Sequence, residues 1–281
     1  MKLRLGNSCG QDESSYERLA KYGYDCGDFQ MANTDDELYH VSEEEFEKRL
    51  KTIKGFADKY KIKIHQMHGP WTWPLKELTM QGKEERFEKM SKSISAAPIL
   101  GCKYWVIHPM MPFNTYDIHL DKSKETWDFN VDYFLRLTEV AKRYDVTICV
   151  ENMPMINYSL ATPRKLVELV ETINDEHFQC CLDTGHVACF GNYPIGDAVR
   201  TMGKHMKVVH VHDNHGQDSH ELPYFGSIDW EDFYQGLCDV KFDGVFNFET
   251  NAPYEKLAPE TADIMQKVLI SIAKQILHEP V

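Results

Sequence analysis

Short apolar runs alternate with longer amphipathic stretches along the whole chain. Apolar runs of about four to eight residues, rich in β-branched and aromatic side chains, are typical of buried strands. Longer stretches with apolar residues at three- and four-residue steps predict helices instead. The predicted strands occupy residues 2–6, 24–30, 62–68, 104–108, 147–151, 179–183, 207–212 and 245–249.

Two of the intervening stretches carry a clear helix start. Ser42 precedes three glutamates, so it is predicted to be an N-cap with acidic residues at the positive end of the helix dipole. Thr162 precedes Pro163, a residue type that suits the first turn of a helix. Further helices are predicted within residues 134–144, 230–237 and 262–277.

The regular alternation of strands and helices predicts a parallel sheet, because parallel strands are joined by crossover helices. An open, doubly wound sheet and a closed barrel both fit this order. The glycine-rich loop of a dinucleotide-binding open sheet is absent after the first strand, where residues 7–10 read Asn-Ser-Cys-Gly. No linker divides the 281 residues, a length typical of one barrel. We therefore predict a single (β/α)8 TIM-barrel domain over residues 1–281.

The charge balance argues against a nucleic-acid partner. The chain has 31 Lys and Arg residues against 44 Asp and Glu, a net charge of −13, and its basic residues are scattered among acidic ones. A protein that grips a phosphate backbone usually presents a basic stripe. We therefore expect a small-molecule substrate and no nucleic acid.

Other bulk features predict a cytoplasmic protein. No apolar run is long enough to span a membrane. Residues 1–6 alternate charged and apolar side chains and do not form the apolar segment of a secretory signal. The eight cysteines contain no CxxC pair, so we expect reduced thiols. Assembly into a homo-oligomer stays open.

Residues with metal-ligating side chains stand at the ends of six consecutive predicted strands. They are His68, His108, Glu151, Asp183, His212 and Glu249, separated by 40, 43, 32, 29 and 37 residues. Each interval is about one βα unit, and the carboxyl ends of TIM-barrel strands meet at one mouth, where active sites lie. Three further candidates follow these strand ends closely, namely His186, Asp218 and His220.

These nine residues offer imidazole nitrogens and carboxylate oxygens without a thiolate, a donor set that suits Zn²⁺ or Mn²⁺. Their number exceeds the need of one ion, which indicates one to three ions, with any surplus histidines left for the substrate. Glu151 and Glu249 would approach across the mouth. Beside a bound ion, such carboxylates can move a proton to and from carbon, and the same ion can activate water.

Simpler structural explanations stay open for each residue taken singly. A strand-end His or Asp is often a loop cap, and Trp71 can pack over the barrel rim as readily as cover a substrate. His210, two residues before His212, is interpreted as a supporting or core residue and not as a ligand. The predicted site therefore depends on the whole set of strand ends.

Three motifs resemble those of a known superfamily. They are Cys-Leu-Asp-Thr-Gly-His at 181–186, His-Val-His-Asp-Asn at 210–214 with the segment 218–230, and Phe-Asn-Phe-Glu-Thr at 246–250. With them the chain resembles the xylose isomerase-like barrels, which include sugar isomerases, ketose 3-epimerases and abasic-site nucleases of the endonuclease IV type. The resemblance to 3-epimerases implies proton transfer by two glutamates, substrate contact by His186, and a metal held by Glu151, Asp183, His212 and Glu249.

The resemblance to endonuclease IV implies that all nine residues hold a trinuclear zinc site. The chain departs from that family after the third strand, where Gly69, Pro70 and Trp71 stand in place of a tyrosine-containing loop. It also lacks the arginine that 3-epimerases carry near position 218. The two functions therefore share one set of strand ends and differ in the surrounding loops.

Because the acidic charge disfavours DNA binding, we predict a metal-dependent sugar or sugar-phosphate isomerase or epimerase. Its expected catalytic residues are Glu151, Glu249 and His186, and its expected substrate-binding residues are His68, His108 and Trp71. We expect few cations at the mouth and aromatic walls that include Trp71, Trp73 and Phe113. The alternatives are a zinc phosphodiesterase of the endonuclease IV type and a barrel that binds a sugar without turnover.

Overall fold

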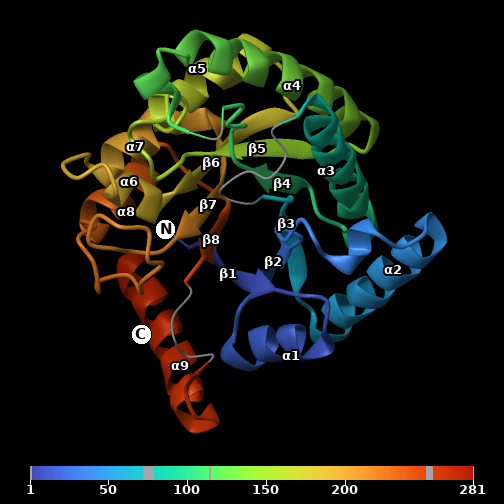
Figure 1. Cartoon of the computed structure of the whole chain (residues 1–281). Coiled ribbons are helices and arrows are strands. Elements are labelled where there is room, and N and C mark those ends of the chain that lie inside the picture. Colours follow the sequence, from blue (N-terminus) through green and yellow to red (C-terminus); the bar gives the residue numbers. More distant parts are fainter. Residues whose placement is uncertain (1, 72–78, 114, 251–255, 281) are drawn as a thin grey trace.

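The computed structural model describes residues 2–71, 79–113, 115–250 and 256–280. Eight parallel strands close into a barrel in sequence order, with β8 paired back onto β1, which confirms the predicted TIM barrel. Figure 1 shows these strands at the centre of the molecule, inside a ring of helices. The strands are β1 (Arg4–Cys9), β2 (Cys26–Gln30), β3 (Lys63–His68), β4 (Tyr104–Ile107), β5 (Thr147–Glu151), β6 (Phe178–Asp183), β7 (Met206–Val211) and β8 (Val245–Phe248).

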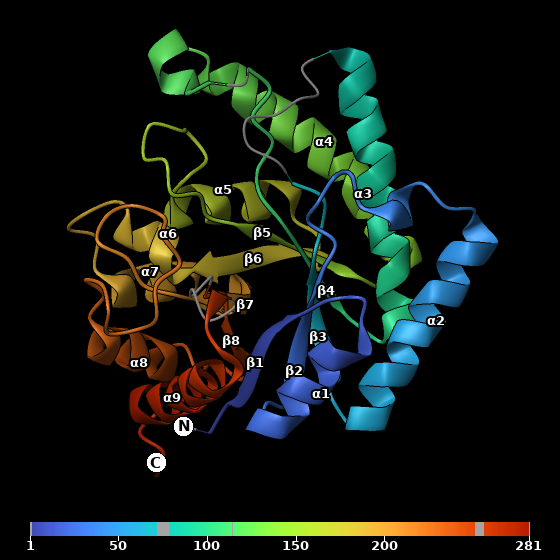
Figure 2. The same cartoon turned by 60° about the horizontal axis from the view of Figure 1, so that its bottom comes forward.

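The helices pack around the outside of the barrel, with α2 and α3 on one side and α7 and α8 on the other (Figures 1 and 2). In the described ranges they are α1 (Glu13–Tyr22), α2 (Glu43–Tyr60), α3 (Met80–Leu100), α4 (Ser123–Arg143), α5 (Pro163–Ile173), α6 (Thr184–Ala188), α7 (Ile195–Met202), α8 (Trp230–Asp239) and α9 (Pro259–Ile276). Short 3-10 helices lie at η1 (Glu37–Tyr39), η2 (Asp117–Leu120) and η3 (Gly203–His205).

Both predicted helix starts are confirmed. The Ser42 hydroxyl accepts a hydrogen bond from the backbone N–H of Glu45 at 3.3 Å, at the start of α2. The Thr162 hydroxyl accepts one from the backbone N–H of Lys165 at 3.4 Å, at the start of α5. Each side chain satisfies a backbone donor that has no partner within its helix.

Among the element boundaries that differ from the prediction, two lie where buried polar residues interrupt the apolar pattern. Helix α4 begins at Ser123 and not near residue 134. Its first turns bury Asn130, whose side chain exchanges hydrogen bonds with the backbone of Met110 at 2.7 and 2.8 Å. Strand β1 continues to Cys9, because the buried Asn7 side chain donates a hydrogen bond to the Tyr24 hydroxyl at 3.1 Å.

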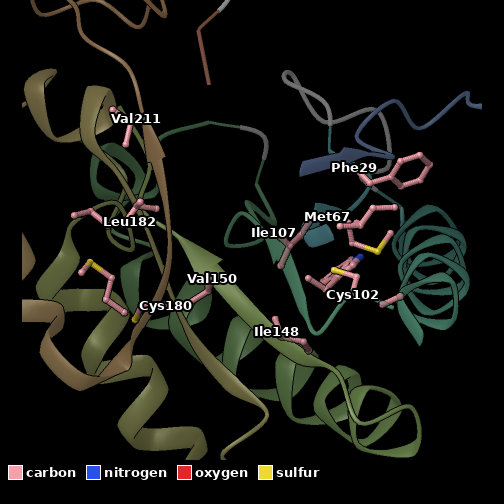
Figure 3. Packing of buried hydrophobic residues seen from close by; sticks show 14 of the residues in the cluster. Phe29, Met67, Cys102, Ile107, Ile148, Val150, Cys180, Leu182 and Val211 are labelled. Carbon is pink, nitrogen blue, oxygen red and sulfur yellow. The ribbon is translucent and has the colours of Figure 1, made fainter. Parts of the chain in front are cut away.

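The apolar core lies between the strands and the helices. Figure 3 shows Phe29 and Met67, from neighbouring strands, beside helix α3. A second, smaller apolar layer is formed on four consecutive strands by the fully buried Val106, Cys149, Cys181 and Val208. This inner layer supports the residues that follow it at the carboxyl ends of the strands.

The cysteines contribute to this packing. All eight lie in the described ranges, none is in a disulfide, and six of them are buried. Burial raises the pKa of the Cys26 thiol to about 11, so this side chain behaves as an apolar core group. Among the described helices, none combines the length and the apolar character that a membrane crossing requires.

Candidate functional site

Strand alternation places the candidate ligands above the inner apolar layer. Side chains two residues apart on a strand point to the same side. Two positions beyond the four inner-layer residues stand His108, Glu151, Asp183 and His210. The side chains along each strand therefore change, within one step, from an apolar layer to polar residues of metal-ligating types at the mouth.

The first group of donor atoms comes from His68, His108 and Glu151. The Nε2 atoms of His68 and His108 lie 3.4 and 3.3 Å from Oε2 of Glu151, a buried oxygen without a hydrogen-bond partner in the described structure. Nδ1 of His68 faces the carbonyl oxygen of Gly69 at 2.8 Å. Donating a proton there leaves Nε2 of His68 available to a metal ion.

Glu151 also belongs to a second group, with Asp183, His210 and Glu249. Nδ1 of His210 lies 2.9 Å from Oε1 of Glu151 and 2.9 Å from Oε2 of Glu249. The resemblance to 3-epimerases implied His212 for this position, and the structure places His210 there instead. The two histidines alternate on one side of the chain, but His210 lies inside β7 whereas His212 follows its end. The sequence alone could not distinguish His210 from His212 as the ligand, because they differ only in their depth in the barrel.

Asp28 on β2 lies behind His210 and was not among the predicted site residues. Its Oδ2 is 3.5 Å from Nε2 of His210 and accepts hydrogen bonds from the side-chain amides of Gln66 and Asn247, both at 3.1 Å. Burial raises the pKa of Asp28 to about 6, although the charge of His210 acts in the opposite direction. A carboxylate on the second nitrogen of a ligating histidine fixes the orientation of its ring.

The third group consists of His186, His212, Asp218 and His220. The two carboxylate oxygens of Asp218 lie 3.4 Å from Nε2 of His186 and 3.3 Å from Nε2 of His220. The rings of His212 and His220 stack with centroids 4.0 Å apart. Nδ1 of His220 faces the backbone oxygen of Glu249 at 2.7 Å, which again leaves Nε2 directed into the group.

Local backbone geometry explains the Asp-Thr-Gly-His motif. The Asp183 carboxylate caps α6 by accepting a hydrogen bond from the backbone N–H of His186 at 2.6 Å, and it lies 2.9 Å from Nε2 of His212. A Cβ on Gly185 would lie 2.0 Å from a ring carbon of His212, so only glycine leaves room for that ring.

Asp213 anchors the loop that carries Asp218 and His220. It is fully buried, and its carboxylate accepts hydrogen bonds from the backbone N–H groups of Tyr224 and Ile228 and from the indole N–H of Trp230. These distances are 3.1, 3.2 and 3.0 Å. The loop is therefore tied to the start of α8 by one carboxylate.

The site holds strongly coupled charges. Burial alone would raise the pKa of Glu151, but the facing histidines, His210 foremost, hold that pKa well below its usual range. The charge of His210 likewise outweighs burial at Glu249 and lowers its pKa. Burial alone would lower the pKa of His186, but neighbouring carboxylates, Asp183 foremost, raise it to about 10. Both carboxylates are therefore ionised at neutral pH.

The distances within the groups fit metal ligation. Donor atoms about 2.1 Å from one ion lie about 3.4 Å apart in a tetrahedron and about 3.0 Å apart in an octahedron. The nitrogen–oxygen separations are 3.3–3.4 Å in the first group, 3.3–3.9 Å in the third group and 2.9 Å around His210. The three groups could therefore hold one to three divalent ions, with Glu151 shared between two of them.

A cavity of about 430 Å³ opens onto these groups. Trp71 forms part of its wall, with its ring centroid 4.8 Å from that of His108. Phe113, a predicted wall residue, is not in the lining, and Trp73 lies outside the described residues. The lining includes neither Lys nor Arg in the part of the chain that the structure describes, as predicted for this mouth.

A closed barrel with His, Asp and Glu donors at the ends of its strands is one recognised class of TIM barrel. The comparison with family models places the chain in such a class. The chain belongs to the xylose isomerase-like TIM barrel family, whose model matches residues 16–268. The match includes every candidate ligand from His68 to Glu249.

Individual relatives are distant. An uncharacterised protein of Methanocaldococcus jannaschii is 26% identical over 245 residues, which cover 84% of this chain and 78% of that protein. The inosose isomerase of Bacillus subtilis is 24% identical over 190 residues, 65% of this chain and 66% of the relative. A crystal structure of a D-tagatose 3-epimerase-like protein superposes with a TM-score of 0.76 at 23% identity, covering 97% of this chain and 98% of the other. At that identity the superposition shows a common fold.

Proposed function

We propose that the chain is a metal-dependent isomerase or epimerase of a small sugar, which transfers a carbon-bound proton by way of carboxylates. The observation that carries the proposal is the pair Glu151 and Glu249, which both lie 2.9 Å from Nδ1 of His210 and line the 430 Å³ cavity. Two ionised carboxylates around one substrate site can remove and return a proton. The names of the inosose isomerase and of the D-tagatose 3-epimerase-like protein support the same reaction class.

The residues of this chain would divide the chemistry between them. A divalent ion, Zn²⁺ or Mn²⁺ by its donor set, would polarise the substrate oxygens next to the reacting carbon. Glu151 and Glu249 are ionised at neutral pH, so either can accept the proton. His186, with a pKa of about 10, can donate a hydrogen bond to a substrate oxygen wherever it does not ligate an ion.

The uncharged part of the pocket favours a neutral sugar over a sugar phosphate. Phosphate groups are usually bound by arginine, lysine or clustered backbone N–H groups. The described lining offers neither of these cations and adds the apolar Met153 and Met155 beside Trp71. An aromatic ring in that position can cover the C–H face of a sugar while His68 and His108 contact its hydroxyls.

Replacing Glu249 tests this proposal. In the Glu249→Gln variant we expect proton exchange at carbon to fall by about 10²–10⁴-fold, the usual contribution of a positioned acid or base. The measurement is deuterium incorporation from solvent into a panel of ketoses and inososes with Mn²⁺ or Zn²⁺ supplied. Glu168→Gln on the outer surface of α5 is the matched control and should retain full activity.

Thermal unfolding of the same variants separates catalysis from folding. A Glu249→Gln protein that melts earlier and still exchanges the proton would assign Glu249 to the fold and sink the proposal. Saturable binding of a sugar without any exchange in the unmodified protein would instead identify a sugar-binding barrel.

A zinc phosphodiesterase of the endonuclease IV type is the second candidate, and the third donor group favours it. One ion suffices for the proposed isomerisation, whereas His186, His212, Asp218 and His220 offer a further complete set of donors. Against it, the described lining of the mouth includes neither Lys nor Arg, the side chains that usually bind a DNA backbone. We expect no binding of an abasic-site duplex at physiological salt. Cleavage of that duplex at a catalytic rate would favour the phosphodiesterase over the isomerase.

A further inference from the structure

A second hollow, of about 620 Å³, lies at the opposite end of the barrel. It is lined by the first residues of β1, β3, β4 and β7 and by the segment that leads into β8. Six of its side chains are basic: Arg4, Lys63, Lys103, Lys204, Lys207 and Lys241. Asp243 is the one acidic residue in the described lining. A chain with a net charge of −13 thus gathers six of its 31 basic residues around one depression.

These six cations differ from most others on the surface. In the described ranges none of them has a carboxylate within 4.0 Å, and Lys207 contacts only the backbone oxygen of Lys204, at 2.8 Å. Many basic residues elsewhere are paired, as Lys21 is with Asp263 at 2.7 Å and Arg200 with Asp239 at 2.8 Å. Like charges held together without counter-charges repel one another, and a bound anion removes that repulsion.

Two irregularities of the barrel place residues on this hollow. Gly27 and Asp28 pair with Ile64 and Gln66, so His65 is an extra residue in β3. Cys180 and Cys181 pair with Met206 and Val208, so Lys207 is an extra residue in β7. Bulges of this kind redirect side chains and are frequent at barrel rims beside functional sites. Since β3 and β7 face each other across an eight-stranded barrel, both bulges serve the same depression from opposite sides.

His65 supplies an unpartnered polar group at this site. It is 7% exposed, its Nε2 has no hydrogen-bond partner in the described structure, and its ring lies 5.1 Å from that of Tyr104. Burial and the charges of Arg4 and Lys63 lower the pKa of His65 to about 3, so the ring is neutral at physiological pH. A neutral imidazole in a cationic hollow can donate one hydrogen bond to an anion.

We propose that this hollow at the amino end of the barrel binds a small polyanion of condensed-phosphate chemistry, either free or as the phosphate chain of a nucleotide. The cations surround the depression from five segments and do not form a stripe, which suits a compact ligand and not a polymer. Lysine ammonium groups bind phosphate as point charges, so a chain of two or three phosphates can contact several at once. This site is separate from the metal-ligating mouth and does not depend on the proposed isomerase activity.

The test is a titration of the full chain with tripolyphosphate by isothermal calorimetry, after chelator treatment so that metal ions at the mouth contribute nothing. We expect one saturable site whose affinity falls as salt rises from 50 to 200 mM, because exposed charges are screened. In the triple variant Lys63→Gln, Lys103→Gln and Lys207→Gln the affinity should fall at least about tenfold. Tripolyphosphate should also raise the melting temperature of the unmodified protein but not that of the variant.

The matched control carries the same change of net charge at paired lysines of α2. Lys48→Gln, Lys51→Gln and Lys59→Gln remove cations that already face glutamates, so affinity should stay within about twofold. An equal loss of affinity in both triple variants would show that only the net charge matters and would overturn the proposal. The absence of saturable binding at millimolar tripolyphosphate would overturn it too. Adenosine triphosphate, titrated in parallel, distinguishes the two sources: tighter binding than tripolyphosphate assigns a nucleotide, and equal binding assigns the phosphate chain alone.

Discussion

At the level of single residues, each of several histidines at the mouth is oriented by a contact of one ring nitrogen, so that the other nitrogen has a defined direction. Nδ1 of His68 and Nδ1 of His220 face backbone oxygens, so their Nε2 atoms point into the donor groups. His210 is turned the other way: its Nδ1 faces Glu151 and its Nε2 faces Asp28. Asp28 faces His210 through charge, without a hydrogen bond in the described structure, and we infer that it positions the ring from below the donor atoms.

Replacing Asp28 should weaken metal binding without unfolding the barrel. In Asp28→Asn the side-chain oxygen can still accept from Gln66 and Asn247, but the carboxylate that orients His210 is lost. We expect metal affinity, measured by calorimetry, to fall about 10–100-fold, as for other partners of ligating histidines. Asp58→Asn on the exposed face of α2 serves as the control. An affinity within twofold of the unmodified protein would contradict the role given to Asp28.

At the scale of elements, the segment between β7 and α8 is held by its own short pairing and by Asp213. The backbones of Asp213 and Glu221 exchange two hydrogen bonds of 2.9 Å, which close the loop that carries Asp218 and His220. The Asp213 side chain then ties the following residues to Trp230 at the start of α8. The third donor group thus depends on the conformation of this one connection.

Asp213→Ala should therefore affect both stability and ion number. Removing the carboxylate leaves the buried indole N–H of Trp230 without an acceptor, at about 1–3 kcal/mol, and also the partly buried backbone N–H of Ile228. We expect the free energy of unfolding, from urea titration, to fall by about 3 kcal/mol. We also expect the protein to lose the ion bound by Asp218 and His220 while retaining ions at the first two groups. Unchanged ion content by elemental analysis would show that the loop forms without this anchor.

At the scale of the whole molecule, the charges divide between the two ends of the barrel. The mouth gathers carboxylates and imidazoles around a cavity whose described lining includes no Lys or Arg. The amino end gathers six basic residues that have no carboxylate partner within the described ranges. The inner apolar layer of Val106 and Cys149 lies between the two ends. The proposed metal site and the proposed anion site can therefore act separately on one scaffold.

Metal uptake by the mouth should release protons and strengthen as pH rises. Carboxylates raise the pKa of His186 to about 10 and that of His220 to about 9 against the effect of burial, so both rings are protonated at pH 7 without a metal. A protonated imidazole has no lone pair for an ion, and each ligating ring must lose its proton first. Zn²⁺ or Mn²⁺ affinity should therefore increase from pH 6 up to about pH 9. With histidines of ordinary pKa, the increase would end near neutral pH.

Calorimetry in two buffers of different ionisation enthalpy counts the released protons. We expect at least one proton for each ion bound by the third group, and elemental analysis should find between one and three ions for each chain. Affinity that is independent of pH between 6 and 8 would contradict the protonation states given to His186 and His220. Failure to take up either metal would contradict the proposal of a metal site at the mouth.

The barrel and the donor residues at its strand ends could be predicted from the sequence alone. Strand alternation and helix caps are local properties, so Ser42 and Thr162 could be recognised as caps from their neighbours alone. The spacing of one βα unit between strand ends was enough to predict that Glu151, Asp183 and Glu249 meet. Local pattern fixes which way a side chain points on its own strand, and a parallel barrel brings all carboxyl ends together.

Other contacts across the barrel could not be predicted from the sequence, because they depend on the closed sheet. His210 and His212 have the same alternation, and the choice between them depends on how deep each lies relative to Glu249. Asp28 reaches His210 because the closed barrel brings β2 and β7 within range of each other. The bulges that place His65 and Lys207 at the amino-end hollow are shifts of register between neighbouring strands, so neither strand alone reveals them. Closure and stagger are properties of the complete sheet, and no local pattern encodes them.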